Sequence, residues 1–306
     1  MQIGMIGLGR MGMNMAIRLL RGRHGVVAFN RTPEKIREIA RQGAAAAFTL
    51  EELVSALKSP RIAWIMLPAG KPTDDMIDSL LPRLKKGDMI IDGSNGFYKD
   101  DIRRAEKLKI AGISYVDAGV SGGIWGLKAG YCLMVGGEKA VCKKLEPIFR
   151  TLAPKDGYLY CGPAGAGHFV KMVHNGIEYG MMSAYGEGFG ILDASPYSKH
   201  LDFGEVAHLW NQGSVVRSWL LELAEKAFNK DKRLSKLEAY VEDSGEGRWT
   251  VQQAIETAVP APVITAALFQ RFSSRDANAF SDRMLAALRN EFGGHTVKQK
   301  KGRGKG

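Results

Sequence analysis

Cysteine is scarce in this chain of 306 residues. The three cysteines, Cys132, Cys142 and Cys161, are an odd number and have neither metal-ligand nor disulfide spacing. This excludes a disulfide framework and favours small core side chains in a reducing compartment over a ligand role. We therefore predict no metal site.

Long apolar runs are also absent. No stretch approaches the 18 residues that a membrane-spanning helix requires. The first residues already have a strand pattern, so we expect no signal peptide and a cytoplasmic protein.

The net charge of +11 excludes an acidic protein. Five positive charges lie in the last nine residues, and without them the charge is still +6. A basic body suits an anionic substrate or cofactor, and nucleic-acid binding is the competing interpretation. The basic end alone is more typical of a solubilising tail. We predict a small-molecule partner, and neither nucleic acid nor membrane.

A glycine-rich loop begins at residue 7. A strand pattern over residues 2–7 leads into glycines with G-x-G-x-x-G spacing, and a helical pattern follows over residues 13–21. Such a loop turns tightly, lets a pyrophosphate approach the backbone and presents the N–H groups of a helix start. We predict that this loop binds a dinucleotide through Gly7, Leu8, Gly9, Arg10, Met11 and Gly12.

An acid is missing from the end of the second predicted strand, residues 25–29. Sites for NAD usually place an acid there for the ribose 2′-hydroxyl, but this chain has Asn30, Arg31 and Thr32. Arg31 could pair with a 2′-phosphate, or it could be an ordinary loop arginine. We predict NADP as cofactor, with NAD as the alternative.

Further strand patterns cover residues 61–67, 89–92, 113–117 and 131–135, with helical patterns between most of them. This alternation predicts an α/β, Rossmann-type, doubly wound parallel sheet, in which ligands bind at the carboxyl ends of the strands. Leu67, Pro68 and Asn95 lie in loops at those ends, and we predict that they bind the cofactor. The Ser121-Gly122-Gly123 loop could bind an anion or be a plain turn.

The second half of the sequence is helical in pattern. A helix is expected from about residue 167 to 192, and others over residues 203–211, 215–228, 251–259, 263–273 and 276–292. We predict a dinucleotide-binding domain over residues 1–163, an all-helical substrate and oligomerisation domain over 164–292, and an extended basic tail over 293–306.

The first long helix carries a stripe of five different polar groups. Their spacing of i, i+3, i+4, i+7 and i+8 places them on one face, whereas the residues between them are apolar or small. Such a stripe is either solvated surface or a site. Its members are Lys171, His174, Asn175, Glu178 and Tyr179.

At this point the sequence resembles a known family. The glycine loop, the 117–123 loop and residues 162–175 are similar to the β-hydroxyacid dehydrogenases. The run from His168 to Tyr179, the 30–32 and 247–250 segments and residues 289–295 resemble the short form of the 6-phosphogluconate dehydrogenase family. The matches span residues 3–295.

The resemblance implies oxidative decarboxylation of 6-phosphogluconate to ribulose 5-phosphate and CO2, a step of the pentose phosphate pathway. It implies Lys171 as general base, Glu178 as general acid and Asn175 beside them. The substrate would be bound by Asn95, Ser121, Gly122, Gly123, His174, Tyr179, Arg271, Arg289 and His295. It also implies a homodimer or homotetramer in which Arg289 and His295 act in a neighbouring subunit.

Two departures concern the phosphate site. Ser244 stands where the long form of the family has a lysine, and Glu246 where it has a threonine. Arg248 could compensate or be structural. The rival interpretations are a non-decarboxylating β-hydroxyacid dehydrogenase, of the 3-hydroxyisobutyrate or tartronate semialdehyde type, and a nucleotide-sensing or nucleic-acid-binding protein on the same scaffold.

Overall fold

The computed structural model describes residues 1–276 and 278–293, without the side chains of residues 292 and 293. The chain divides into two compact units, Met1–Asn175 and Gly176–Gly306. The boundary expected at 163/164 coincides with the change from strands to helices, but the compact units divide after Asn175. The first unit extends further, because the start of the first long helix packs against the sheet.

The first unit is built on one sheet, which has eight strands within the described residues. They are β1 (Gln2–Ile6), β2 (Gly25–Phe29), β3 (Ala45–Ala47), β4 (Ile62–Ile65), β5 (Met89–Asp92), β6 (Ser114–Ser121), β7 (Cys132–Gly137) and β8 (Tyr158–Gly162). Their order is β3-β2-β1-β4-β5-β6-β7-β8. The first six follow the order of dinucleotide-binding sheets, which confirms the predicted fold class.

One neighbouring pair departs from the predicted parallel sheet. β6 and β7 are antiparallel, with Val116 opposite Gly137 and Ser121 opposite Cys132, whereas the other pairs are parallel. The connection between these two strands has ten residues and holds only η2 (Gly123–Trp125) and α6 (Gly126–Ala129). A crossover to a parallel strand needs a longer connection.

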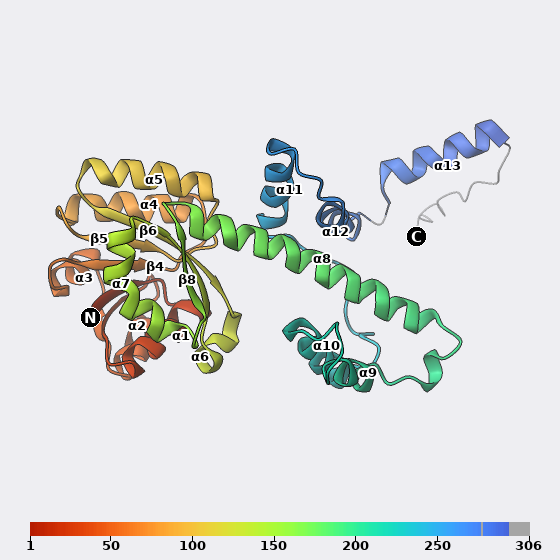
Figure 1. The fold of residues 1–306 in the computed structure, drawn as a ribbon, viewed down its shortest axis with the longest axis horizontal. Helices are drawn as coiled ribbons and strands as arrows, with labels where there is room; N and C mark the ends of the chain where they lie inside the picture. Colours follow the sequence, from red (N-terminus) through yellow and green to blue (C-terminus); the bar gives the residue numbers. More distant parts are fainter. Residues whose placement is uncertain (277, 294–306) are drawn as a thin grey trace, which may run out of the picture. The chain divides into compact units, whose positions relative to one another are not determined.

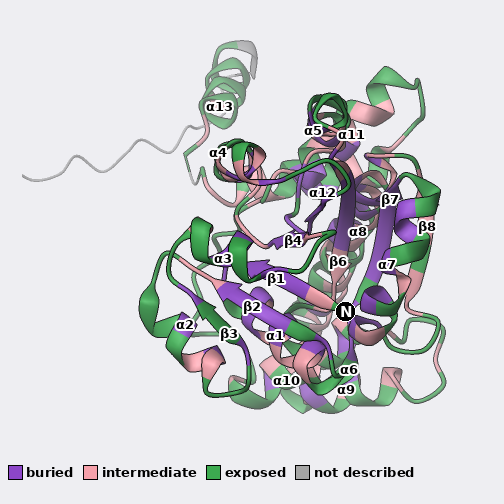
Figure 2. Cartoon of the chain, turned by 90° about the vertical axis from the view of Figure 1, so that its left-hand side faces the viewer, coloured by how far each residue is buried: buried purple, intermediate pink, exposed green. Residues whose placement is uncertain are grey.

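Helices cover both faces of this sheet (Figure 1). α1 (Arg10–Arg21), α2 (Pro33–Ala40) and α7 (Lys139–Leu152) bury their apolar residues in one core with Trp64. α3 (Leu50–Ala56), α4 (Lys71–Leu80), η1 (Leu81–Arg83) and α5 (Tyr98–Ile110) lie on the other face, where α3, α4 and α5 pack around Ile65 and Ile90. Figure 2 shows buried residues along the strands and exposed residues on the outer sides of helices such as α2 and α4.

The cysteines do not all lie in this core. Cys142 is buried, Cys161 is only partly buried, and Cys132, the first residue of β7, is exposed. The expectation of three core side chains was therefore wrong for Cys132. All three are free thiols.

The second unit is helical. α8 (Ala166–Ala194) begins in the first unit and is followed by η3 (Ser198–His200), α9 (Phe203–Trp210), α10 (Trp219–Lys230), α11 (Glu246–Glu256), α12 (Pro262–Ser273) and α13 (Phe280–Gly293). α10 begins four residues later than expected, because Ser218 caps it by accepting a hydrogen bond from the Leu221 N–H at 3.1 Å. The tail expected over residues 293–306 lies outside the described residues from residue 294 onward.

Two small apolar cores stabilise the second unit. One surrounds Phe189, Phe203 and Phe228, and the other joins Tyr179 to Ala267 and Leu268. Among the described helices, none combines the length and apolar composition that crossing a membrane requires.

Candidate active site

The glycine loop between β1 and α1 has the geometry that the sequence predicted. Gly7 has a φ of +95°, and a Cβ added there would lie 2.5 Å from the Met66 carbonyl oxygen. A Cβ on Gly12 would lie 2.0 Å from the Gly7 carbonyl oxygen, whereas one on Gly9 would meet nothing within 4 Å. Gly9 precedes α1 without a side-chain cap. The loop therefore packs tightly on its inner side and presents open backbone N–H groups, which fits a dinucleotide pyrophosphate.

The residues at the end of β2 lie against this loop. The Leu8 N–H donates to Asn30 Oδ1 at 3.0 Å, and Asn30 Nδ2 donates to the Thr32 carbonyl at 3.2 Å. Arg31 is exposed and makes no hydrogen bond or ion pair with the part of the chain that the structure describes. Asn30 thus shapes the loop, whereas the Arg31 guanidinium is available to an anion.

The loops after β4 and β5 complete this edge of the sheet. The Leu67 side chain lies 3.0 Å from the position of a Cβ on Gly7, and the Pro68 carbonyl accepts a hydrogen bond from Thr73 Oγ1 at 2.9 Å. Asn95 is exposed three residues after β5 ends. Since the carboxyl ends of parallel strands share one edge, these residues lie at the edge where ligands bind.

Lys171 lies at the centre of a polar cluster on α8. The lysine is 7% exposed, and its Nζ donates to Asn175 Oδ1 at 2.7 Å and lies 3.5 Å from His174 Nδ1. His174 Nε2 lies 3.3 Å from Ser121 Oγ, so the 121–123 loop reaches the stripe across 53 residues of sequence. The stripe is therefore largely buried in the first unit, and the solvated-surface alternative does not hold there.

Glycines bring α8 close to the sheet at Lys171. A Cβ on Gly119 of β6 would lie 2.5 Å from Lys171 Cβ and 3.0 Å from the Gly167 carbonyl oxygen. A Cβ on Gly167 would lie 2.4 Å from the Met134 carbonyl oxygen. Because Gly119 and Gly167 have no side chains, α8 packs closely against the sheet, and this determines how near to the sheet Lys171 lies.

The other members of the stripe belong to the second unit. Glu178 is half-buried on α8. Tyr179 is buried, and its hydroxyl accepts a hydrogen bond from the Ser244 N–H at 3.2 Å. The Arg271 guanidinium stacks 3.5 Å from the centre of the Tyr179 ring and donates to the Glu242 carbonyl at 2.9 Å. Tyr179 and Arg271, predicted together as phosphate ligands, are therefore in contact.

The residues that depart from the long form lie beside Tyr179. Ser244 Oγ donates to Glu246 Oε2 at 2.6 Å, and Glu246 is 1% exposed. Arg248 pairs with Asp243 at 2.6 Å and stacks on the Phe272 ring, so its side chain has a structural role. Arg289 is exposed on α13, and His295 lies outside the described residues.

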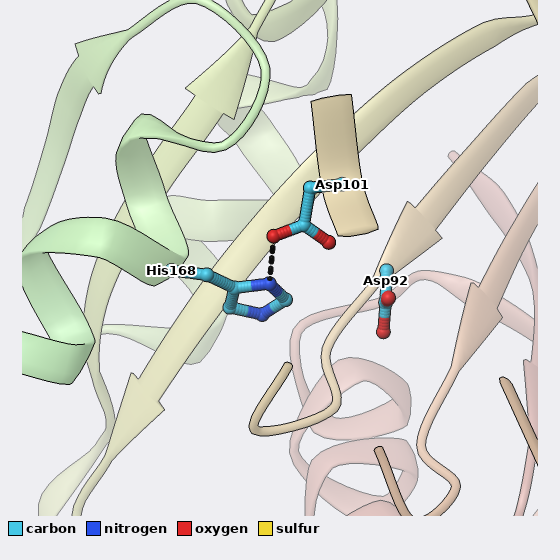
Figure 3. A group of neighbouring side chains, drawn as sticks. All are labelled: Asp92, Asp101 and His168. Carbon is cyan, nitrogen blue, oxygen red and sulfur yellow. Dashed lines mark hydrogen bonds and ion pairs between the residues drawn. The ribbon is translucent and has the colours of Figure 1, made fainter. Parts of the chain in front are cut away.

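A buried charged cluster beneath the site was not foreseen from the sequence. Figure 3 shows Asp92 at the end of β5, Asp101 on α5 and His168 on α8. His168 Nδ1 bonds Asp101 Oδ2 at 2.8 Å, and Arg104 Nη1 lies 3.1 Å from Asp92 Oδ2 and 3.5 Å from Asp101 Oδ1. The Tyr115 hydroxyl lies 2.7 Å from Asp101 Oδ1 and 2.9 Å from Asp92 Oδ2, so its one proton is within reach of both carboxylates. Their charge is therefore compensated by an arginine and an imidazole, and a metal ion would have to displace these partners.

The pKa values follow from this burial. Burial disfavours the charged imidazole, but the charge and hydrogen bond of Asp101, with the charges of Asp92 and Asp117, raise the pKa of His168 to about 10. Burial raises the pKa of Asp117 to about 6. The neighbouring carboxylates therefore favour the protonated form of the His168 imidazole.

The chain matches one enzyme family in both halves. Residues 2–162 match the NAD binding domain of 6-phosphogluconate dehydrogenase, and residues 167–283 match the 6-phosphogluconate dehydrogenase C-terminal domain. The chain is 43% identical over 302 residues to the NAD(+)-dependent, decarboxylating 6-phosphogluconate dehydrogenase of Haloferax volcanii, covering 98% of this chain and 99% of that protein.

Other relatives differ in length and cofactor. The NADP(+)-dependent, decarboxylating enzyme of Bacillus subtilis is 39% identical over 287 residues, which cover 89% of this chain and 61% of that longer protein. The 6-phosphogluconate dehydrogenase of Plasmodium falciparum superposes with a TM-score of 0.82 at 30% identity, over 98% of this chain and 67% of that one. The resemblance seen in the sequence is thereby confirmed, and the chain belongs to the family of NAD(P)-dependent, decarboxylating 6-phosphogluconate dehydrogenases.

Proposed function

We propose that this protein oxidises and decarboxylates 6-phospho-D-gluconate to D-ribulose 5-phosphate and CO2, with reduction of NADP, as a step of the pentose phosphate pathway. The observation that carries the proposal is the buried Lys171 amine, hydrogen-bonded to Asn175 and adjoined by His174 and Ser121. Acting as a general base requires this amine to be neutral before it accepts a proton.

Lys171 acts as the general base in the first step. A nicotinamide cofactor held by the glycine loop after β1 would supply the acceptor for the hydride that leaves C3 of the substrate. Lys171 Nζ takes the proton of the C3 hydroxyl, and the resulting ketone lies β to the carboxylate. The carboxylate then leaves as CO2, because the ketone accepts the electron pair as an enol. The protonated Lys171 gives its proton to that oxygen as the enol forms and takes it back when C1 is protonated, so the chemistry needs no metal.

Glu178 acts as the general acid in the last step. It gives a proton to the carbon that becomes C1 of ribulose 5-phosphate. Lys171 and Glu178 lie seven residues apart on α8, which places them on one face and about 10.5 Å apart along the helix axis. Two proton transfers at different carbons of one sugar suit this spacing.

The remaining predicted residues hold the substrate. Its carboxylate and hydroxyls would contact the residues near Lys171, namely Asn95, Ser121, Gly122, Gly123, His174 and Asn175. Its phosphate would contact Tyr179, Arg271, Arg289 and His295. Stacking on Tyr179 holds the Arg271 guanidinium in a fixed plane, which suits bidentate binding of a phosphate.

Arg31 supports the preference for NADP. Its exposed guanidinium follows β2, where an acid would bind the 2′-hydroxyl of NAD. The family contains relatives named as NAD(+)-dependent and others named as NADP(+)-dependent. Membership of the family therefore does not determine the cofactor, and the preference for NADP is our proposal for this chain. We also propose a cytoplasmic location, because the three free thiols suit a reducing compartment.

We further propose a homodimer or homotetramer. The second unit contains an apolar groove of about 520 Å³ that includes Phe189, Phe203 and Phe228. Val263 and Phe269 of the same unit are largely exposed, and large apolar patches typically mark association surfaces. Light scattering would show a dimeric or larger mass, and a monomer at assay concentration would refute this part.

Complementation tests whether Arg289 acts in a neighbouring subunit. Lys171→Met and Arg289→Ala should each be inactive alone. After the two variants are unfolded and refolded together, mixed oligomers would contain sites with an intact lysine from one chain and an intact arginine from the other. Regained activity supports action in trans, and continued inactivity of proven mixed oligomers refutes it.

The function itself is tested by the initial rate of 6-phosphogluconate oxidation with CO2 release. Reduced cofactor and CO2 should appear in equal amounts. Lys171→Met should lower kcat by about 10²- to 10⁴-fold, the usual contribution of a general base. Lys71→Met, at an exposed position on α4, should leave kcat unchanged. Cofactor reduction without CO2 would favour the non-decarboxylating rival, and no turnover of wild type would refute the proposal.

A further inference from the structure

His168 joins two segments of the site that are far apart in sequence. It lies in the first turn of α8, three residues before Lys171, and is 1% exposed. Its Nδ1 bonds Asp101 Oδ2 of α5 at 2.8 Å (Figure 3). The side chain therefore faces the interior of the first unit, and it does not act on substrate directly.

On one side of His168, the buried Asp117 holds the start of α8. The two carboxylate oxygens of Asp117 accept hydrogen bonds from the N–H groups of Gly165 at 2.7 Å and His168 at 2.8 Å. These N–H groups at the start of a helix would otherwise lack partners. Together with the Asp101 bond to the imidazole, they fix the helix turn that precedes Lys171.

On the other side, the cluster holds the loop that carries Asn95. Asp92 Oδ1 accepts a hydrogen bond from the Ser94 N–H at 2.9 Å. A Cβ on Gly96 would lie 3.1 Å from His168 Nδ1, so the loop passes directly over the imidazole. Both neighbours of Asn95 in sequence thus contact this cluster.

The imidazole also balances charge at this point. Asp92, Asp101 and Asp117 are each fully buried, and Arg104 provides one compensating charge. A neutral side chain at position 168 would leave the carboxylates with less compensation, and buried carboxylates relax by moving or by taking up a proton. Either response would shift the segments that these carboxylates hold.

We propose that His168, held by Asp101, is a positioning residue for the oxidation step. It fixes the α8 turn before Lys171 and the loop that carries Asn95 in position relative to each other. This inference rests on the proposed function, in which Lys171 is the base. A displacement of about 1 Å in a reacting group can lower the rate about 10²-fold. His168→Phe keeps a ring of similar size and removes both ring nitrogens, so kcat should fall by about that factor.

Three further variants separate positioning from general damage. His168→Asn retains a donor near the Nδ1 position and should recover part of the loss. Asp101→Asn removes the charged partner of His168, and it provides the same test if His168→Phe does not fold. Asp88→Asn is the matched control, because Asp88 is equally buried at the opposite end of β5 and pairs with Arg61.

The kinetic measurement is the isotope effect on kcat/KM with 6-phosphogluconate deuterated at C3. Misplacement of Lys171 slows the step that breaks the C3–H bond, so the isotope effect should rise in the His168 and Asp101 variants and stay at the wild-type value in Asp88→Asn. Loss of folded enzyme lowers kcat without changing the isotope effect. An unchanged isotope effect in His168→Phe and Asp101→Asn, with or without a fall in kcat, would overturn the proposal.

Hydrogen exchange provides a test that does not depend on turnover. Amides of residues 93–97 and 165–172 should exchange faster in His168→Phe and in Asp101→Asn than in wild type, and those near Asp88 should not. Faster exchange in only one of the two segments, or in neither, would refute a shared positioning role. A wild-type enzyme that failed to oxidise 6-phosphogluconate would refute the proposed function, and the exchange result would still decide whether His168 couples the two segments.

Discussion

The depth of Lys171 above the sheet can be tested with a single methyl group. Gly119→Ala would place a Cβ 2.5 Å from Lys171 Cβ. Carbon atoms in contact prefer about 3.5 to 4.0 Å, so the lysine would have to move by about 1 Å or more. A displacement of this size predicts a fall in kcat of about 10²-fold. Overpacking should also cost about 1 to 3 kcal/mol of unfolding free energy.

The assay is steady-state oxidation of 6-phosphogluconate at saturating cofactor, alongside urea unfolding and fluorescence titration with reduced cofactor. The cofactor dissociation constant should change little, because the glycine loop after β1 is a separate segment from Gly119. Gly25→Ala is the matched control, since the same substitution in the same sheet meets its nearest neighbour, the side chain of Gln2, at 3.4 Å. It should leave kcat unchanged.

Two results would contradict the prediction that Gly119→Ala lowers kcat by displacing Lys171. A kcat for Gly119→Ala within about threefold of wild type would mean that the position of Lys171 does not limit the rate. A loss of cofactor binding equal to the loss of kcat would mean that the substitution disrupts the whole first unit.

Three further predictions address the cofactor, stability and pH. Arg31→Ser should lower kcat/KM with NADP by about 10- to 100-fold, the worth of a charged hydrogen bond, and equal losses with NAD would contradict the assignment. Arg104→Met removes the guanidinium that pairs with Asp92 and Asp101 and leaves only the His168 imidazole beside Asp101. It should cost about 3 to 5 kcal/mol in urea unfolding, whereas an unchanged midpoint would contradict a stabilising role. Because the pKa of His168 is raised from 6.5 to about 10, its contribution to stability is complete below pH 6.5 and is lost as the pH rises to about 10. Unfolding measured from pH 6 to 10 should show this decline in wild type and a flatter profile in His168→Asn.

Much of the first unit could be predicted because its signals are local. β2 and β5 have the predicted bounds, since each is a short apolar run between turn residues. β3 was not predicted, because Ala45–Ala47 contains none of the β-branched or aromatic residues that mark strands. β8 was missed as well, because the sequence of Tyr158–Gly162 shows no alternation of apolar and polar residues.

The site was predictable only along one helix. The periodicity of α8 placed the stripe residues on one face, but it could not show which loop faces them. Ser121 meets His174 across 53 residues, and the same Ser-Gly-Gly sequence is compatible with a plain turn. Asp100 and Asp101 are adjacent acids on α5, yet only Asp101 is fully buried, and its partner His168 is 67 residues away. Such long-range pairings follow from the sheet order and not from local sequence.

The position on α8 of both groups that we propose for proton transfer, Lys171 and Glu178, has a consequence for how this segment can change. The six residues between Lys171 and Glu178 act as a spacer whose length, and not whose individual side chains, keeps the two groups on one face. Deleting or inserting one residue there would turn Glu178 by about 100° around the helix and shift it by about 1.5 Å along the axis. Within the spacer, substitutions of the apolar or small residues act through packing, whereas His174 and Asn175 also contact Lys171. Any change of the spacer's length would separate the proposed base from the proposed acid.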